Sequence, residues 1–349
     1  MKKIISASTL AVVTALSLTA CTPPMPPELL AQIAEQTYTC EAGNATLQTT
    51  AAIEALVSGW QDSLATACTD MTFAMATATE SPNIVISASA PDAAVCVPLA
   101  TVPYAFDAGV VEAYFADGTQ VQLSAKSLSQ ILSKKITDWS DPQLAKDNPN
   151  VILPSLAISI TPTADANALT AVTSWLTRLD STFSNTSITA SSDTAIDLST
   201  LADGSLTILN YSDAAVFGLT PAAIIAGKNV NSDAVLPSND TIDSAASQFV
   251  VKHVAGSTQI SLNPSKKPTP PRGADTAVAP YQAAYPVNLT ICGEDSLVNR
   301  AVAKYLLRQD SQGAIGSANL VGLPEAIRGE ALIDVSKGLP TPKVTPPSN

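Results

Sequence analysis

The pattern of apolar and polar positions predicts helices and strands that follow one another along most of the chain. Apolar side chains recur at helical spacing in four segments, 51–67, 128–132, 168–179 and 299–309. In the first of these, Ile53, Trp60 and Leu64 fall on one face. Extended runs rich in β-branched and aromatic residues predict strands over 37–40, 71–76, 83–87, 95–106, 151–160 and 205–209. This succession favours an α/β fold with largely parallel sheets.

The N-terminal segment has the features of an export signal. Lys2 and Lys3 precede an apolar run that ends in Leu-Thr-Ala-Cys at Cys21. The run is shorter than the ~20 residues that span a bilayer. Cysteine after Leu-Thr-Ala is typical of a bacterial lipobox, in which Cys21 is lipidated; the alternative is an ordinary secretory signal with a chance cysteine. We expect a signal peptide over 1–20, a lipid anchor and Pro-rich spacer over 21–35, and a location on the extracytoplasmic face of the bacterial membrane.

Composition and charge exclude several classes of protein. Hydrophobic residues make up 46% of the 349 residues, so a chain disordered throughout is excluded. The formal net charge of −12 argues against a nucleic-acid partner. His253 is the only histidine, and no nucleophile–base pair or metal-ligand spacing is visible. We therefore expect no enzyme, no catalytic residue, no metal and no other cofactor. The one basic cluster, Lys266, Lys267 and Arg272, lies in a Pro-rich tract that is typical of a surface loop.

Cysteine usage agrees with export. Four cysteines remain when Cys21 is set aside: Cys40, Cys68, Cys96 and Cys292. An even number in an exported chain predicts two disulfides, and three pairings are possible from the count alone.

Several ordered segments resemble one known family. The segment 102–108 is followed by Lys-Ile-Thr-Asp-Trp-Ser-Asp-Pro over 135–142, and later by 204–211, 285–287 and 322–324. This order is similar to that of the phosphate-type periplasmic binding proteins, the substrate-binding lipoproteins of phosphate ABC transporters. The resemblance implies the two-lobe periplasmic binding protein fold (type II), an α/β fold with the ligand cleft between the lobes.

The resemblance also implies how the chain is divided. Lobe one would comprise 36–101 plus 249–330 and lobe two 102–248, with crossings near Thr101 and Phe249 and a Pro-rich tail over 331–349. Cys96 and Cys292 would then lie in the same lobe, and Cys40 and Cys68 would begin neighbouring strands. The implied disulfides are therefore Cys40–Cys68 and Cys96–Cys292.

Three segments correspond to the ligand-binding turns of that family. The turn before the first helix resembles 44–47, and the second turn resembles 87–91, where Ser89 stands in place of the family's aspartate. The third, an Arg-x-Asp-Gly-Ser-Gly-Thr motif at a helix start, falls on 161–170, where the arginine, both glycines and the final threonine are missing. The candidate ligand-binding residues carried over are Thr46, Leu47, Ser87, Ser89, Thr163, Asp165 and Asn167.

Of the three segments, residues 161–170 differ most from the family's phosphate-binding motif. Asp165 can cap the following helix with its own carboxylate, and a dianion beside that carboxylate would be repelled. Helix capping is accordingly the simpler interpretation of Thr163, Asp165 and Asn167.

The sequence leaves two functions open. One is a lipid-anchored binding protein that presents a small solute to an ABC permease, with the standard phosphate site lost. The alternative is a non-transporting surface protein that reuses the fold for interaction.

Overall fold

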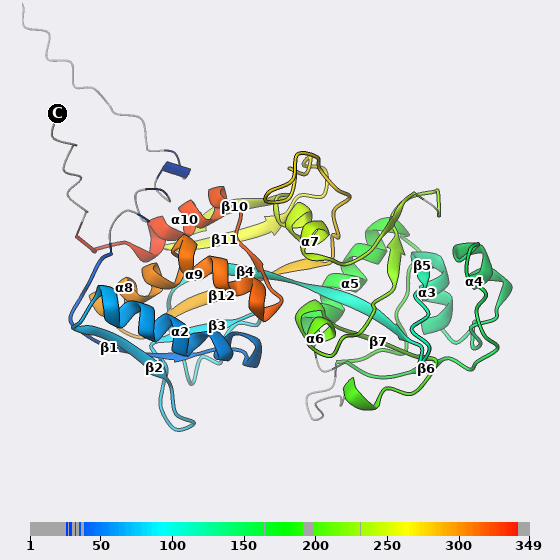
Figure 1. Ribbon diagram of the computed structural model, residues 1–349, viewed down its shortest axis with the longest axis horizontal. Helices are drawn as coiled ribbons and strands as arrows, with labels where there is room; N and C mark the ends of the chain where they lie inside the picture. The colour runs from blue at the N-terminus through cyan, green and yellow to red at the C-terminus, as the bar shows by residue number, and fades with distance from the viewer. Residues whose placement is uncertain are drawn as a thin grey trace, which may run out of the picture.

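The computed structural model describes residues 38–163, 165–190, 198–230 and 232–340, together with residues 26, 28, 29, 32 and 35. The predicted signal peptide, Cys21 and the last nine residues of the chain lie outside the described residues. Within the described ranges, no helix combines the length and the apolarity that a membrane crossing requires. The chain forms two α/β lobes, joined by one long strand that runs through both (Figure 1).

Lobe one is built on a mixed sheet with the strand order β2-β1-β3-β12-β4, flanked by helices (Figure 1). Its strands are β1 (Gly43–Gln48), β2 (Met71–Met75), β3 (Ile84–Ser87), β4 (Pro98–Tyr114), β12 (Ala284–Cys292) and β13 (Val321–Gly322). A separate hairpin is formed by β10 (Phe249–Val254) and β11 (Ser257–Leu262). The helices of this lobe are α2 (Ala51–Ala67), α8 (Leu297–Leu306), α9 (Gln309–Ala314), η2 (Ile315–Ala318) and α10 (Glu325–Val335).

Lobe two is assembled around the second half of β4. That half pairs with β7 (Ser205–Asn210), and β7 in turn pairs with β6 (Ser159–Ile160). A second small sheet contains β5 (Gln122–Ser124), β8 (Ala223–Ile225) and β9 (Ala234–Val235). The helices are α3 (Ala125–Leu132), α4 (Pro142–Asp147), α5 (Ala166–Leu179), η1 (Leu198–Thr200) and α6 (Tyr211–Val216), with α7 (Asn239–Ala246) on the returning segment.

The partner of β4 changes where the chain passes between the lobes. β4 pairs with β12 as far as Ala108 and with β7 from Gly109 onward, which lies beyond the crossing expected near Thr101. A Cβ atom at Gly109 would lie only 2.3 Å from the backbone oxygen of Ala168. The missing side chain therefore lets the first turn of α5 pack directly against β4 at the boundary.

Several predicted elements are confirmed by the structure. The helix over 51–67 has the predicted bounds, and α5 begins two residues before the predicted 168. The disulfides Cys40–Cys68 and Cys96–Cys292 are both formed. Each covalent link removes freedom from the unfolded chain and typically contributes about 2–4 kcal/mol to stability.

Other predictions were wrong. The sheets are mixed rather than largely parallel, because β12 returns antiparallel between β3 and β4. Residues 38–40 are not a strand, and the turn expected over 44–47 is strand β1, which pairs with β2 on one edge and β3 on the other. Only the last two residues of 151–160 form a strand. The tail expected from 331 begins later, since α10 continues to Val335 with an apolar face buried in the core.

Candidate functional site between the two lobes

Two segments from different lobes meet at the N-terminus of α5. Ser89 follows the end of β3 in lobe one, and Asn167 lies in the first turn of α5 in lobe two. The Asn167 side-chain amide Nδ2 donates a hydrogen bond to Ser89 Oγ at 2.9 Å. Strand ends and helix N-termini expose unpaired backbone groups, so polar ligands commonly bind where they face each other. The structure thus brings together two of the candidate residues carried over from the sequence.

Asp165 occupies the anion-binding end of α5 with its own carboxylate. Its Oδ1 accepts hydrogen bonds from the backbone N–H groups of Asn167, at 2.8 Å, and Ala168, at 2.9 Å. Its Oδ2 accepts from the Tyr285 hydroxyl at 3.3 Å. The N–H groups that could hold a bound anion at this helix start are therefore already satisfied.

Thr163 and Ser87 shape the backbone on either side of this contact. Thr163 is 1% exposed, and its hydroxyl oxygen accepts from the backbone N–H of Asp165 at 3.0 Å. The Ser87 hydroxyl donates to the backbone oxygen of Ser89. Both hydroxyl groups fix local turns, so they position Asp165 and Ser89.

Thr46 and Leu47 lie within β1, and their side chains are engaged in the interior of lobe one. The Thr46 hydroxyl donates to Asn83 Oδ1 at 3.0 Å and accepts from the backbone N–H of Asn83 at the same distance. Leu47 is fully buried. The structure does not bring these two side chains to the contact between Ser89 and Asn167.

An acidic cluster lies beside this contact. It consists of Asp107 on β4, Asp165 before α5 and Asp213 on α6, and all three raise the pKa of the Tyr285 hydroxyl electrostatically, in addition to the larger effect of its burial. Tyr285 lies opposite Asp107 in the pairing of β12 with β4. No arginine or lysine forms an ion pair with these carboxylates in the part of the chain that the structure describes.

Asp107 is the most strongly perturbed member of the acidic cluster. Its side chain is buried, and its oxygens accept from the backbone N–H groups of Ala108 and Ser212 and from the Ser212 hydroxyl at 2.7 Å. Burial raises its pKa to about 7 against the lowering effect of these hydrogen bonds. Burial likewise raises the pKa of Asp213, with a further contribution from Asp165. The protonation of the Asp107 carboxyl group can therefore change near neutral pH.

Four neighbours of the site were not predicted from the sequence: Asp107, Ser212, Asp213 and Tyr285. A usable signal was present for Asp107, because it is a carboxylate within an apolar run and buried carboxylates are rare without a partner. No such signal exists for Tyr285, whose position depends on the register between β12 and β4. Among the described residues, no grouping of three or more His, Cys, Asp or Glu side chains could hold a metal ion.

Comparison with known proteins identifies the fold. No protein-family model matches the chain, and no curated protein matches it by sequence. A high-affinity periplasmic phosphate-binding protein (PfluDING), solved with phosphate bound, is similar in structure, with a TM-score of 0.54 and 13% sequence identity. The match covers 86% of this chain and 100% of that protein. A human phosphate-binding apolipoprotein has a TM-score of 0.51 at 14% identity, covering 82% of this chain and 93% of that one.

These similarities confirm the fold expected from the resemblance. The chain has the two-lobe α/β architecture of the periplasmic phosphate-binding proteins. At such low identity the comparison establishes the fold alone, and the ligand has to be argued from the residues of this chain.

Proposed function

We propose that the protein is an extracytoplasmic solute-binding protein that holds a small solute between its two lobes. The observation that carries this proposal is the hydrogen bond from Asn167 to Ser89, which joins the lobes at the strand ends and helix start described above. The proposed lobes are those expected from the sequence, 36–101 with 249–330 and 102–248, and the change in the pairing of β4 at Gly109 supports a boundary along that strand.

Lipid anchoring and a permease partner belong to the same proposal. The Leu-Thr-Ala-Cys sequence at Cys21 supports attachment to the membrane through that cysteine. The structural neighbour described as a periplasmic phosphate-binding protein supports a location outside the cytoplasm. The resemblance to the binding proteins of phosphate ABC transporters supports delivery of the solute to an ABC permease.

The proposed solute is not phosphate bound in the manner of that family. Asp165 already accepts from the N–H groups at the start of α5, and Asp107 and Asp213 add negative charge beside it. A phosphate dianion placed there would be repelled, since no arginine stands in the corresponding motif. A neutral or cationic solute with hydrogen-bond donors fits this boundary better.

A second function is favoured by the same contact. The side chains of Asn167 and Ser89 are hydrogen-bonded to each other, and the Tyr285 hydroxyl donates a hydrogen bond to Asp165. A protein that uses the closed two-lobe body only as a rigid scaffold for interaction or adhesion would need no opening of these contacts. This is the non-transporting surface protein left open by the sequence.

Titration calorimetry with inorganic phosphate tests the loss of the phosphate site. We expect the full-length protein to show no binding tighter than about 1 mM at neutral pH. Micromolar binding that disappears in Asn167→Ala would contradict this and return the protein to phosphate uptake. An unrelated exposed substitution, Lys146→Ala, serves as the control for protein quality.

A thermal-shift panel of sugars, amines, amino acids and anions separates the two functions. Solute binding between the lobes predicts a shift for at least one compound that is lost in the double variant Ser89→Ala/Asn167→Ala. If no compound shifts the wild type, or the shift persists in that variant, the proposal for the cleft fails and the interaction protein is favoured.

A further inference from the structure

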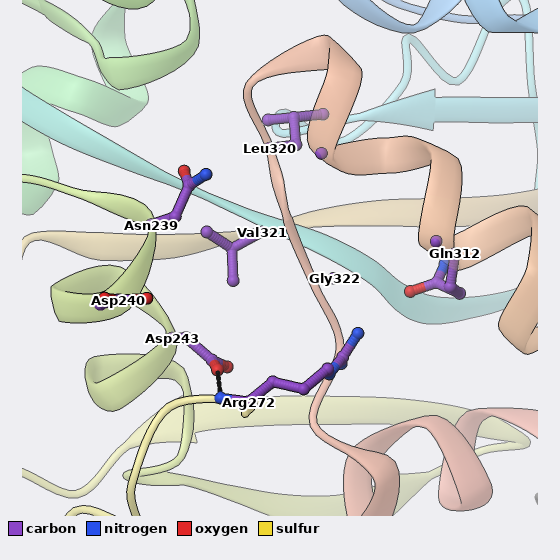
Figure 2. A pocket seen from close by; sticks show the side chains of 10 residues that line it. Asn239, Asp240, Asp243, Arg272, Gln312, Leu320, Val321 and Gly322 are labelled. Carbon is purple, nitrogen blue, oxygen red and sulfur yellow. Dashed lines mark hydrogen bonds between the residues drawn. The ribbon is translucent and has the colours of Figure 1, made fainter. Parts of the chain in front are cut away.

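A polar cavity of about 200 Å³ is lined by residues of α7, of α9 and of the segment after α9, together with Arg272. Figure 2 shows α7 on one side, with Asn239 and Asp240, and α9 with the segment that follows it on the other, with Gln312 and Gly322. The Arg272 side chain extends between the two sides. Neither the acidic cluster nor Ser89 or Asn167 contributes a side chain to its lining.

Arg272 is fixed at both ends. Its backbone N–H donates to Asp243 Oδ2 at 2.8 Å, and its Nη2 donates to the backbone oxygen of Leu323 at 2.9 Å. In the described part of the chain, Nε and Nη1 have no hydrogen-bond partner and no carboxylate forms an ion pair with the guanidinium. A guanidinium held in this way is preorganised to receive an oxyanion, and a carboxylate matches its paired N–H geometry.

The opposite side of the cavity carries negative charge. Asp240 lies in the first turn of α7, and its carboxylate is exposed without a hydrogen-bond partner among the described residues. Asp243 uses one oxygen for the Arg272 backbone. A ligand that carries only a negative charge would be repelled by these carboxylates. A ligand that carries only a positive charge would be repelled by Arg272. Opposite charges on one small molecule satisfy both sides.

The remaining walls are apolar or open. Leu320 and Val321 are buried residues that line the cavity, and Figure 2 shows the Val321 side chain between α7 and the facing segment. An added Cβ at Gly313 or Gly316 would meet no atom within 4 Å, so these glycines leave space open. The Gln312 side chain donates to Tyr104 O at 3.0 Å and accepts from Leu323 N at 3.2 Å.

We propose that this cavity binds a small aliphatic α-amino acid as a zwitterion. The carboxylate of the ligand is held by Arg272, its ammonium group by Asp240, and its side chain by Leu320 and Val321. The volume is below that of pockets for drug-sized ligands, which suits a molecule of this size. The proposal explains why the Pro-rich basic tract ends in an arginine that is anchored rather than solvated.

Calorimetric titration of the full-length protein with L-valine tests the site. Isobutyrate lacks the ammonium group and isobutylamine lacks the carboxylate, so each is expected to bind at least about tenfold more weakly than L-valine. Absence of L-valine binding at about 10 mM overturns the proposal, as does equal binding of either analogue.

Two variants locate the binding. Arg272→Gln is expected to weaken L-valine binding by about tenfold or more, while Lys267→Gln in the same tract leaves it unchanged. Gly322→Ala keeps every charge but places a methyl group 3.7 Å from Arg272 Nη1 in ordinary contact, and it is expected to weaken binding without loss of folding. Binding that survives both variants overturns the proposal. Loss of binding in Ser89→Ala/Asn167→Ala also overturns it, by placing the ligand between the lobes instead, whereas failure of the cavity leaves the function of the cleft untouched.

Discussion

Buried charged groups have different partners at the lobe boundary and at the far side of lobe one. In the acidic cluster, Asp107 is compensated only by neutral donors, and its pKa rises to about 7 through burial. On the far side, Arg328 is 2% exposed but donates to the carboxylates of Glu35 and Glu325.

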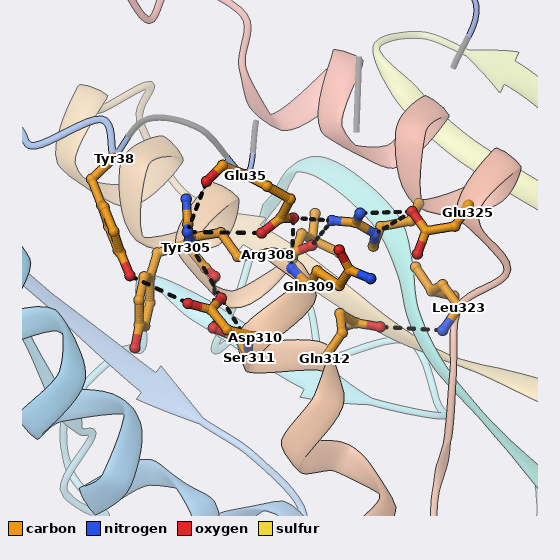
Figure 3. A network of polar contacts seen from close by, with 12 residues as sticks. Glu35, Tyr38, Tyr305, Arg308, Gln309, Asp310, Ser311, Gln312, Leu323 and Glu325 are labelled. Atoms are coloured by element: carbon orange, nitrogen blue, oxygen red, sulfur yellow. Dashed lines mark hydrogen bonds and ion pairs between the residues drawn. The ribbon is translucent and has the colours of Figure 1, made fainter. Parts of the chain in front are cut away.

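The same network binds the segment that precedes the folded body. Arg308 donates to the backbone oxygen of Glu35 at 3.2 Å, and its guanidinium lies 3.9 Å from the centre of the Tyr38 ring (Figure 3). Opposite charges placed together cancel much of the cost of burial and hold distant segments in place. A cluster of carboxylates without a nearby cation retains the full cost of burial. Such clusters are common at functional sites and uncommon in a structural core.

Removing the central arginine of the network should have the largest effect on stability. Arg328→Ala leaves Glu35 and Glu325 without their buried partner and also removes a bond to the backbone oxygen of Leu307 at 3.0 Å. We expect a loss of about 3 kcal/mol in the free energy of unfolding, measured with urea. Lys267→Ala, an exposed cation, is the control and should stay within about 0.5 kcal/mol of the wild type. Similar values for the two variants would show that the network does not stabilise the fold.

The pH dependence of stability tests the acidic cluster. The folded pKa of Asp107, about 7, lies above the ordinary value of 3.8, so the folded state binds more protons between these limits. Stability should therefore fall as pH rises from about 4 to about 7. Burial of Glu112 acts in the same direction, and the raised pKa of His253 extends the fall to higher pH.

Asp107→Asn removes one titrating group while a rotation of the Ser212 hydroxyl can preserve its hydrogen bond. We expect the decline in unfolding free energy between pH 5 and pH 8 to shrink by roughly 1–2 kcal/mol relative to the wild type. Glu112→Gln is the matched comparison, because burial also raises the pKa of Glu112 but this residue lies outside the acidic cluster. An unchanged decline in Asp107→Asn would contradict the assigned burial effect.

The smallest effect is expected at the cap of α5. Asp165→Ala removes the acceptor for the N–H groups of Asn167 and Ala168 and should lower unfolding free energy by about 1 kcal/mol. Asp165→Ser keeps a capping oxygen without the charge, so it should recover much of the loss. If serine is as destabilising as alanine, the carboxylate contributes through Tyr285 rather than through the cap.

The local sequence predicted secondary structure correctly where the periodicity of apolar residues matches the side chains that are buried. The helix α2 has the predicted bounds because its apolar residues recur at a spacing that only a helix places on one face. Strand β1 was missed, since Gly43 and Asn44 have low strand propensity and the strand is stabilised by partners on both edges. Residues 38–40 have strand-like side chains but no strand partner; Tyr38 instead stacks on Tyr305, and Cys40 is held by its disulfide.

The candidate site was only partly accessible from the sequence. The resemblance pointed to Ser89 and Asn167, and helix capping by Asp165 followed from its place before an apolar helix. Their roles toward a ligand stay predictions until binding is measured. The approach of Tyr285 to Asp165, and of Asp107 to Ser212, depends on how β4 and β12 are paired and on where α6 begins.

The sequence alone determined the alternation of helices and strands, the number of disulfide-forming cysteines and the absence of an arginine from residues 161–170. These are properties of composition and of spacing over a few turns. Only the tertiary structure decided which carboxylates share the lobe boundary, which arginines are neutralised and where Arg272 lies. Each of those outcomes depends on residues far apart in the chain being brought together, and burial then sets the energy of a charge according to the neighbours it meets.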